Sequence, residues 1–122
     1  MCIDAIQFAD PPLAGLVELR RLLAPGGRMI LTTWEAADPA DVRVLARIRA
    51  VGPQRDLLAA GFVDVDVRER PDWRALEHAL WDEALAAPAD IDQAMTSLQA
   101  EGHRSVAAWD SLRRVLATAT AP

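Results

Sequence analysis

A Pro-Gly-Gly turn joins an amphipathic segment to an apolar run, and this feature constrains the fold more than any other. Before Pro25–Gly27, apolar residues recur at helical spacing from Leu13 to Leu23. Glycine accepts the left-handed backbone with which helices often end. The next residues, 28–33, read as a strand buried on both faces, as in a parallel sheet. The turn therefore predicts a helix followed directly by a buried strand, the arrangement of an α/β fold.

Periodicity places further elements on both sides of this turn. Met1 to Ile3 is a short apolar run that we expect to be a strand end, and Asp10 is expected to cap the first helix. The other expected elements are helices at about 40–50 and 54–60, a strand at 63–68, helices at 73–87 and from 88 to about 112 (with Ile91 in its apolar repeat), and a weak final strand at 115–120. The order predicts a βαβαβ unit with a parallel sheet, followed by helices.

Composition and charge exclude several classes of protein. The chain has 122 residues, of which 52% are hydrophobic and 25% charged, so we expect one globular domain. Its net charge of -5 offers no basic surface for nucleic acid or anionic lipid, and no apolar run is long enough to cross a membrane. A single cysteine, Cys2, excludes an intrachain disulfide. The N-terminus shows no signal peptide, so we expect a cytoplasmic protein without nucleic-acid or membrane partners.

Two ordered motifs resemble class I S-adenosylmethionine-dependent methyltransferases. In that family a strand ending in Asp leads to a helix that closes with Glu-x-x-Arg-x-Leu-x-Pro-Gly-Gly, which here spans Glu18 to Gly27. Residues 57–62 are similar to the family's Leu-x-x-Ala-Gly-Phe turn into its sixth strand, and 113–118 match its seventh. The resemblance implies a partial doubly wound, Rossmann-like sheet containing strands four to seven. A helical insertion at 70–112, a possible substrate cover, precedes the last strand.

The resemblance also shows what this sequence lacks. The family cradles the methionine end of S-adenosylmethionine in a glycine-rich G-x-G-x-G loop and holds the ribose with an acidic residue after the second strand. No G-x-G-x-G occurs in these 122 residues. The chain therefore looks like the C-terminal half of a methyltransferase, and we expect it to bind the cofactor weakly or not at all by itself.

The resemblance implies where ligands would bind. Cys2, Ile3 and Asp4 would end the fourth strand and face the cofactor, although Cys2 and Ile3 are equally well explained as buried strand residues. Gln7 and Phe8 would border the methyl-transfer cleft. Some relatives place a histidine base there, but glutamine cannot take a proton, so we expect Gln7 at most to position substrate. Phe8 is equally well explained as a plug in the core.

Trp34 and Glu35 would end the fifth strand at the same edge of the sheet. Trp34 could stack on a planar substrate and Glu35 could accept a proton, whereas packing and a solvated loop are the plain alternatives. For the tryptophans expected on the later helices, core packing is the better explanation than a substrate cover. His78 is expected to lie on the solvated side of its helix. These tryptophans are Trp73, Trp81 and Trp109.

No metal site is expected from the sequence. His78 and His103 lack a carboxylate at ligand spacing. Asp64 and Asp66 are better explained as the exposed face of an edge strand, where charge discourages aggregation.

Two functions follow from these observations. The first is methyl transfer from S-adenosylmethionine to a small-molecule acceptor, incomplete in this chain. The alternative is a non-catalytic half-domain, an interaction or complementation module that pairs with itself as a homo-oligomer or with a separate N-terminal half. An uncovered strand edge at Met1–Ile3 would favour such pairing.

Overall fold

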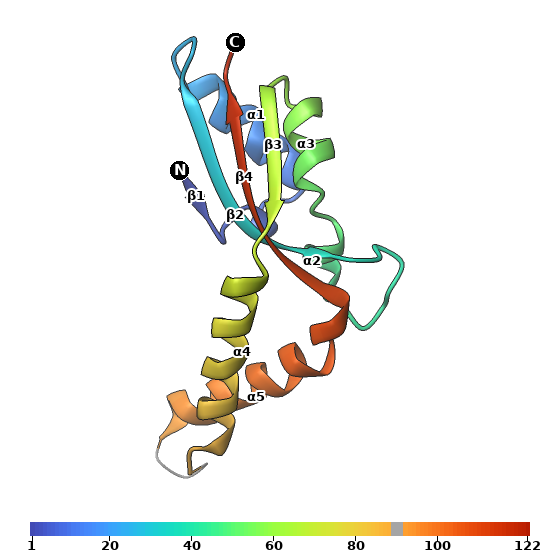
Figure 1. The fold of residues 1–122 in the computed structure, drawn as a ribbon, viewed down its shortest axis with the longest axis vertical. Helices are drawn as coiled ribbons and strands as arrows, with labels where there is room; N and C mark the ends of the chain where they lie inside the picture. The colour runs from blue at the N-terminus through green and yellow to red at the C-terminus, as the bar shows by residue number, and fades with distance from the viewer. Residues whose placement is uncertain (89–91) are drawn as a thin grey trace.

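A computed structural model describes residues 1–88 and 92–122 of the chain (Figure 1). Ile91, expected in the apolar repeat of a late helix, lies outside the described residues. One mixed sheet contains β1 (Cys2–Ile3), β2 (Arg28–Ala36), β3 (Val63–Glu69) and β4 (Leu112–Thr120), in the order β1-β2-β4-β3. This arrangement confirms the partial Rossmann-like α/β sheet that the resemblance implied.

The parallel arrangement predicted for the strands up to residue 68 does not extend to the last strand, for which the sequence predicted no direction. β1 pairs with β2 in parallel, but β4 lies antiparallel between β2 and β3. Between β3 and β4 the chain forms a helical hairpin of α4 (Pro71–Ala86) and α5 (Gln93–Ala107), which extends away from one end of the sheet (Figure 1). Because the hairpin returns the chain to the end of the sheet that it left, the next strand must run back.

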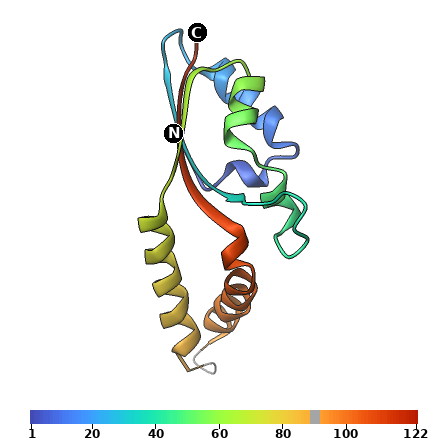
Figure 2. The same cartoon turned by 45° about the vertical axis from the view of Figure 1, so that its right-hand side comes forward.

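Two helices cover one face of the sheet. α1 (Pro12–Leu22) and α3 (Pro53–Ala59) lie on the same side, as Figure 2 shows, and no described helix covers the opposite face along the same stretch. The core beneath them is apolar and closely packed. It includes Leu16, Met29, Leu31, Leu57, Phe62 and Ala117, each no more than 2% exposed.

Both glycines of the Pro-Gly-Gly turn are required, for different reasons. Gly26 has a φ of 77°, a conformation that strains other residues. Gly27 has an ordinary φ, but a Cβ atom there would lie 2.7 Å from the carbonyl oxygen of Ala24. The backbone N–H of Gly26 donates to Ala121 at 2.8 Å, which ties the turn to the end of β4.

Two local expectations were wrong. Asp10 does not cap α1: the N-cap is Pro11, without a side-chain hydrogen bond. The helix expected at 40–50 shortens to α2 (Ala46–Arg49), because two aspartates hold the preceding segment in turns. Asp38 accepts from the backbone N–H of Ala40 at 2.8 Å, and Asp41 accepts from that of Arg43 at 3.0 Å. Such side-chain bonds compete with helix formation.

A capping residue begins the second helix of the hairpin, and a glycine allows the two helices to pack closely. The side chain of Asp92 accepts from the backbone N–H of Met95 at 2.8 Å and caps α5. Gly102 lets α5 approach α4, since a Cβ there would lie 3.0 Å from the ring of Trp81. Two single turns of 3-10 helix, η1 (Ile6–Phe8) and η2 (Trp109–Ser111), complete the fold. Among the described helices, none has the length and apolar character needed to span a membrane.

Candidate functional site

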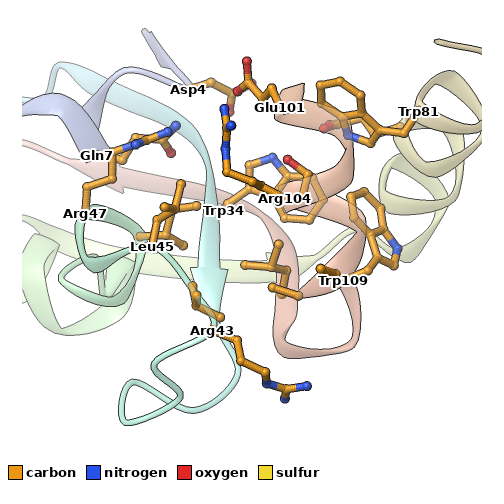
Figure 3. Close-up of a pocket in the computed structure, with 17 residues that line it drawn as sticks. Asp4, Gln7, Trp34, Arg43, Leu45, Arg47, Trp81, Glu101, Arg104 and Trp109 are labelled. Atoms are coloured by element: carbon orange, nitrogen blue, oxygen red, sulfur yellow. The ribbon is translucent and has the colours of Figure 1, made fainter. Parts of the chain in front are cut away.

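A pocket of about 470 Å³ lies where the ends of β1 and β2 meet the helical hairpin (Figure 3). Since β1 and β2 are parallel, their carboxyl ends lie at the same edge of the sheet. Asp4 directly follows β1, Gln7 comes from η1, and Trp34 lies near the end of β2. The carboxyl edge of an α/β sheet is where ligands usually bind, and the pocket's volume suits a small organic molecule.

Three of the residues expected at a ligand site line this pocket, namely Asp4, Gln7 and Trp34. The side-chain oxygen of Gln7 accepts a hydrogen bond from the Thr33 hydroxyl at 3.2 Å. This bond orients the amide so that its NH₂ group is available to a ligand. The roles of these residues toward a ligand stay predictions.

The other four residues lie elsewhere. Cys2 packs against the core under α1, while Ile3, one position on, is 59% exposed on the opposite face of the sheet. Phe8 is 67% exposed in a second hollow, with the Arg47 guanidinium 5.2 Å from its ring centre, so its interpretation as a core plug is wrong. Glu35 does not line the pocket.

Glu35 belongs to an ion pair rather than to a solvated loop. A carboxylate oxygen of Glu35 lies 3.1 Å from a terminal nitrogen of Arg113, and only 20% of the Glu35 side chain is exposed. Burial raises the pKa of Glu35 despite the opposing charge of Arg113. Alternation along β2 places Glu35 on the face opposite to Trp34, away from the pocket.

A buried arginine organises one wall of the pocket, and its partners were not predicted from the sequence. Arg114 on β4 is 6% exposed. Its terminal nitrogens donate to both carboxylate oxygens of Asp4, one of them at 2.7 Å, and its Nε lies 2.8 Å from Glu77 on α4. The Thr32 hydroxyl also donates to Asp4, at 3.1 Å. Asp4 is thereby paired with a buried cation, which makes it a poor candidate for a general base.

Glu77 connects the hairpin to this network. Burial raises its pKa, while the charge of Arg114 opposes the rise. Arg114 thus joins the end of β1 to α4, and its guanidinium lies 5.3 Å from the ring centre of Trp34. One residue of the last strand therefore positions three residues of the pocket wall: Asp4, Trp34 and Glu77.

An aromatic cluster forms another wall. The rings of Trp34 and Trp109 meet edge to face with centroids 5.0 Å apart, and His78 meets Trp109 in the same way at 5.1 Å. His78 also hydrogen-bonds Asp82 at 3.0 Å, so it is a packing residue with one wet side rather than a freely solvated one. Trp81 lines the pocket from α4.

The carboxylates show no arrangement suited to a metal ion. In residues 1–88 and 92–122, no group of three or more His, Cys, Asp or Glu side chains is placed to hold one. Asp64 and Asp66 lie exposed on β3, which is an edge strand as expected. Asp66 pairs with Arg68 at 2.6 Å.

The glycines of the described residues do not line the pocket, so they form no cradle for S-adenosylmethionine there. Gly26 and Gly27 lie at the start of β2, at the opposite end of that strand from the pocket. They shape a structural turn rather than a ligand loop. Both carboxylate oxygens of Asp4 already accept hydrogen bonds, Oδ1 from Thr32 and Arg114 and Oδ2 from Arg114.

The fold is found in solved enzyme structures. Phosphoethanolamine N-methyltransferase 2 from Haemonchus contortus, in complex with phosphomonomethylethanolamine and S-adenosylhomocysteine, superimposes with a TM-score of 0.72 at 15% identity; the match covers 98% of this chain and 32% of that one. The same enzyme with S-adenosyl-L-methionine gives 0.72 at 14% identity, with the same coverage. The [4+2]-cyclase SpnF gives 0.65 at 17% identity, covering 99% of this chain and 48% of that one.

These likenesses define a class of fold. The chain has the fold of part of a class I methyltransferase, and it spans about a third to a half of the length of these structures. Neither a protein-family model nor a curated protein matches the sequence. One of the three similar structures is a [4+2]-cyclase, so the fold leaves the reaction open.

Proposed function

We propose that this chain forms the acceptor-binding part of an enzyme that transfers a methyl group from S-adenosylmethionine to a small molecule. The observation that carries the proposal is the pocket at the carboxyl ends of β1 and β2, closed by the α4–α5 hairpin. The methyltransferase with bound S-adenosyl-L-methionine shares this fold, which supports the choice of cofactor.

The pocket would contribute by positioning its ligand rather than by moving protons. Asp4 and Glu77 are both held by Arg114, and Gln7 cannot take a proton. The Gln7 amide and the face of Trp34 would instead orient the acceptor. Orientation alone accounts for large rate enhancements when the reacting groups are held in line.

A complete site needs a segment that carries the glycine-rich loop. Calorimetry with S-adenosylhomocysteine should therefore show weak or no binding to the 122-residue chain. The coding sequence next to this chain provides the decisive comparison. A strand followed by G-x-G-x-G, in frame or in a neighbouring gene, supports the proposal.

The protein reconstituted with that segment should transfer labelled methyl from S-adenosylmethionine to small acceptors. Trp34→Ala should raise the KM for the acceptor more than it lowers kcat. Glu18→Gln, an exposed change on α1, serves as the control. A reconstituted protein that binds S-adenosylhomocysteine but transfers no methyl group would refute the proposed activity.

A second candidate is favoured by the uncovered side of the sheet. Ile3 is 59% exposed and Ile30 40%, and both belong to strands that have no described helix over that face. β1 hydrogen-bonds only to β2 among the described strands. A non-catalytic module that pairs with an N-terminal half, or with a second copy, would bury these groups. The absence of any neighbouring G-x-G-x-G segment would favour this candidate.

A further inference from the structure

We propose that the pocket selects acceptors that combine an apolar body with an anionic oxygen group, a carboxylate or a phosphate. This inference rests on the proposed function, because it takes the ligand of the pocket to be the methyl acceptor. It specifies the chemical class of that acceptor. It follows from which polar groups of the pocket already have partners and which do not.

The acidic groups deep in the pocket are already engaged. Both oxygens of Asp4 accept hydrogen bonds from Arg114, and Glu77 lies 2.8 Å from the same guanidinium. A cationic ligand would have to compete with a buried arginine for either carboxylate. The remaining acid of the lining, Glu101, lies exposed on α5, where water screens its charge.

The basic groups are divided between engaged and free. A terminal nitrogen of Arg43 donates to the Asp41 carboxylate at 2.6 Å and to the Ser111 hydroxyl at 2.7 Å. Arg47 and Arg104 are exposed, as Glu101 is. Among the described residues Arg47 contacts only the ring of Phe8, which leaves its guanidinium N–H groups available. Arg104 makes no hydrogen bond, ion pair or ring contact within the described part of the chain, and both Arg47 and Arg104 line the pocket.

The position of these two arginines is more informative than their identity. All thirteen basic residues of this protein are arginines, so the residue type alone shows nothing. In the described residues only Arg28, Arg47 and Arg104 lack a hydrogen bond or ion pair, and two of these three line one pocket. In Figure 3 the Arg104 side chain extends toward Asp4 and that of Arg47 toward Gln7.

The free groups are therefore mostly donors. The NH₂ group of Gln7 adds to the two guanidinium groups, and the indole N–H of Trp81 has no acceptor among the described residues. Donors without acceptors favour a ligand rich in oxygen atoms, and guanidinium groups match carboxylate and phosphate geometry. Apart from Ser105, the other surfaces of the pocket are mainly apolar. They belong to Val44, Ile48, Trp81, Ala108, Trp109 and Leu112.

Binding of three matched probes to the full chain, without S-adenosylmethionine, tests this inference. The probes are phenylpropionate, phenethyl phosphate and the neutral phenylpropanol. Calorimetry and tryptophan fluorescence follow binding, and the protein contains no tyrosine to interfere with the fluorescence. The two anions should bind roughly tenfold more tightly than the alcohol, and added salt should weaken only the anions.

Variants locate the effect. Arg104→Gln and Arg47→Gln should each weaken anion binding roughly three- to tenfold and leave the alcohol unchanged. Glu101→Gln should strengthen anion binding, since it removes the one free negative charge. Arg28→Gln is the matched control, because Arg28 is equally unpaired but lies at the start of β2, outside the pocket.

The outcomes separate this inference from the proposed function. Equal affinity for anions and alcohol, or no binding of any probe, would overturn the inference whatever the protein does with S-adenosylmethionine. An equal loss of anion binding in Arg28→Gln and Arg104→Gln would also overturn it. A clear anion preference in a reconstituted protein that transfers no methyl group would overturn the proposed function and leave the selectivity of the pocket standing.

Discussion

Replacing Arg114 by methionine tests whether the pocket wall depends on this one cation. Methionine keeps most of the apolar volume of the arginine stem but removes the hydrogen bonds to Asp4 and the ion pair with Glu77. The two carboxylates would then lie near each other without a counter-charge. We expect the variant to fold but to be clearly less stable than the wild-type protein.

The structure sets the size of this loss. Breaking a buried ion pair by removing one partner costs about 3–5 kcal/mol. Asp4 and Glu77 keep 39% and 33% of their side-chain surface exposed, so water partly solvates them, which favours the low end of that range. A loss of about 3 kcal/mol corresponds to a decrease in Tm of roughly 10 °C for a domain of this size.

The adjacent arginine supplies the control. Arg113 lies on the opposite face of β4, pairs with Glu35 at 3.1 Å and is 43% exposed, compared with 7% for the Arg114 side chain. A pair of this kind contributes about 0–1 kcal/mol. Thermal unfolding followed by circular dichroism should therefore show a much smaller change in Tm for Arg113→Met. Equal losses in the two variants would show that the Arg114 network does not stabilise the protein as argued.

Three further predictions concern the turn, the acid on α4 and the strand edge. Gly27→Val should lower Tm more than Glu35→Gln, because a side chain at Gly27 would collide with the Ala24 carbonyl; equal Tm values would refute this reasoning. Burial raises the pKa of Glu77 above its usual 4.5, so the folded state holds the proton more tightly and stability falls as pH rises from about 4.5 to the raised pKa. The Tm of Glu77→Gln relative to wild type should therefore increase with pH over that interval, and a flat difference in thermal unfolding curves would contradict it. The chain should self-associate at micromolar concentration, and Ile3→Lys should reduce this by placing a charge on the edge strand; sedimentation showing a single 13.3 kDa species for the wild type would count against it.

Local sequence signals predicted most of the fold. The helix and the strand on either side of the Pro25–Gly27 turn, the alternating strand β3 and the hairpin helices follow from periodicity and glycine positions. The direction of β4 could not be derived in this way, because a strand of alanine, valine and threonine carries no signal of its orientation. The end of the sheet to which the hairpin returns the chain decides that orientation.

The candidate site was less predictable than the fold. Asp4, Gln7 and Trp34 were expected from the resemblance, and all three line the pocket. Glu35 illustrates the limit of such reasoning: one position along a strand reverses the face, so neighbours in sequence point to different surroundings. Arg47 and Arg104 could not have been identified from the sequence. Their significance depends on the partners they lack, which only the folded arrangement defines.

The pocket forms only when the two ends of the chain meet. Arg114 and Asp4 are 110 positions apart, and their contact requires β4 to be inserted between β2 and β3. That insertion also places α4 against β4 at the end of the sheet, because α4 and β4 are connected through the hairpin. The same guanidinium then binds Glu77 of α4 at 2.8 Å. The contacts of Arg114 thus couple the pairing of the last strand to the placement of the hairpin and of Asp4. A change that weakens β4 should therefore disturb both the pocket and the core under α1, to which β4 contributes Ala117.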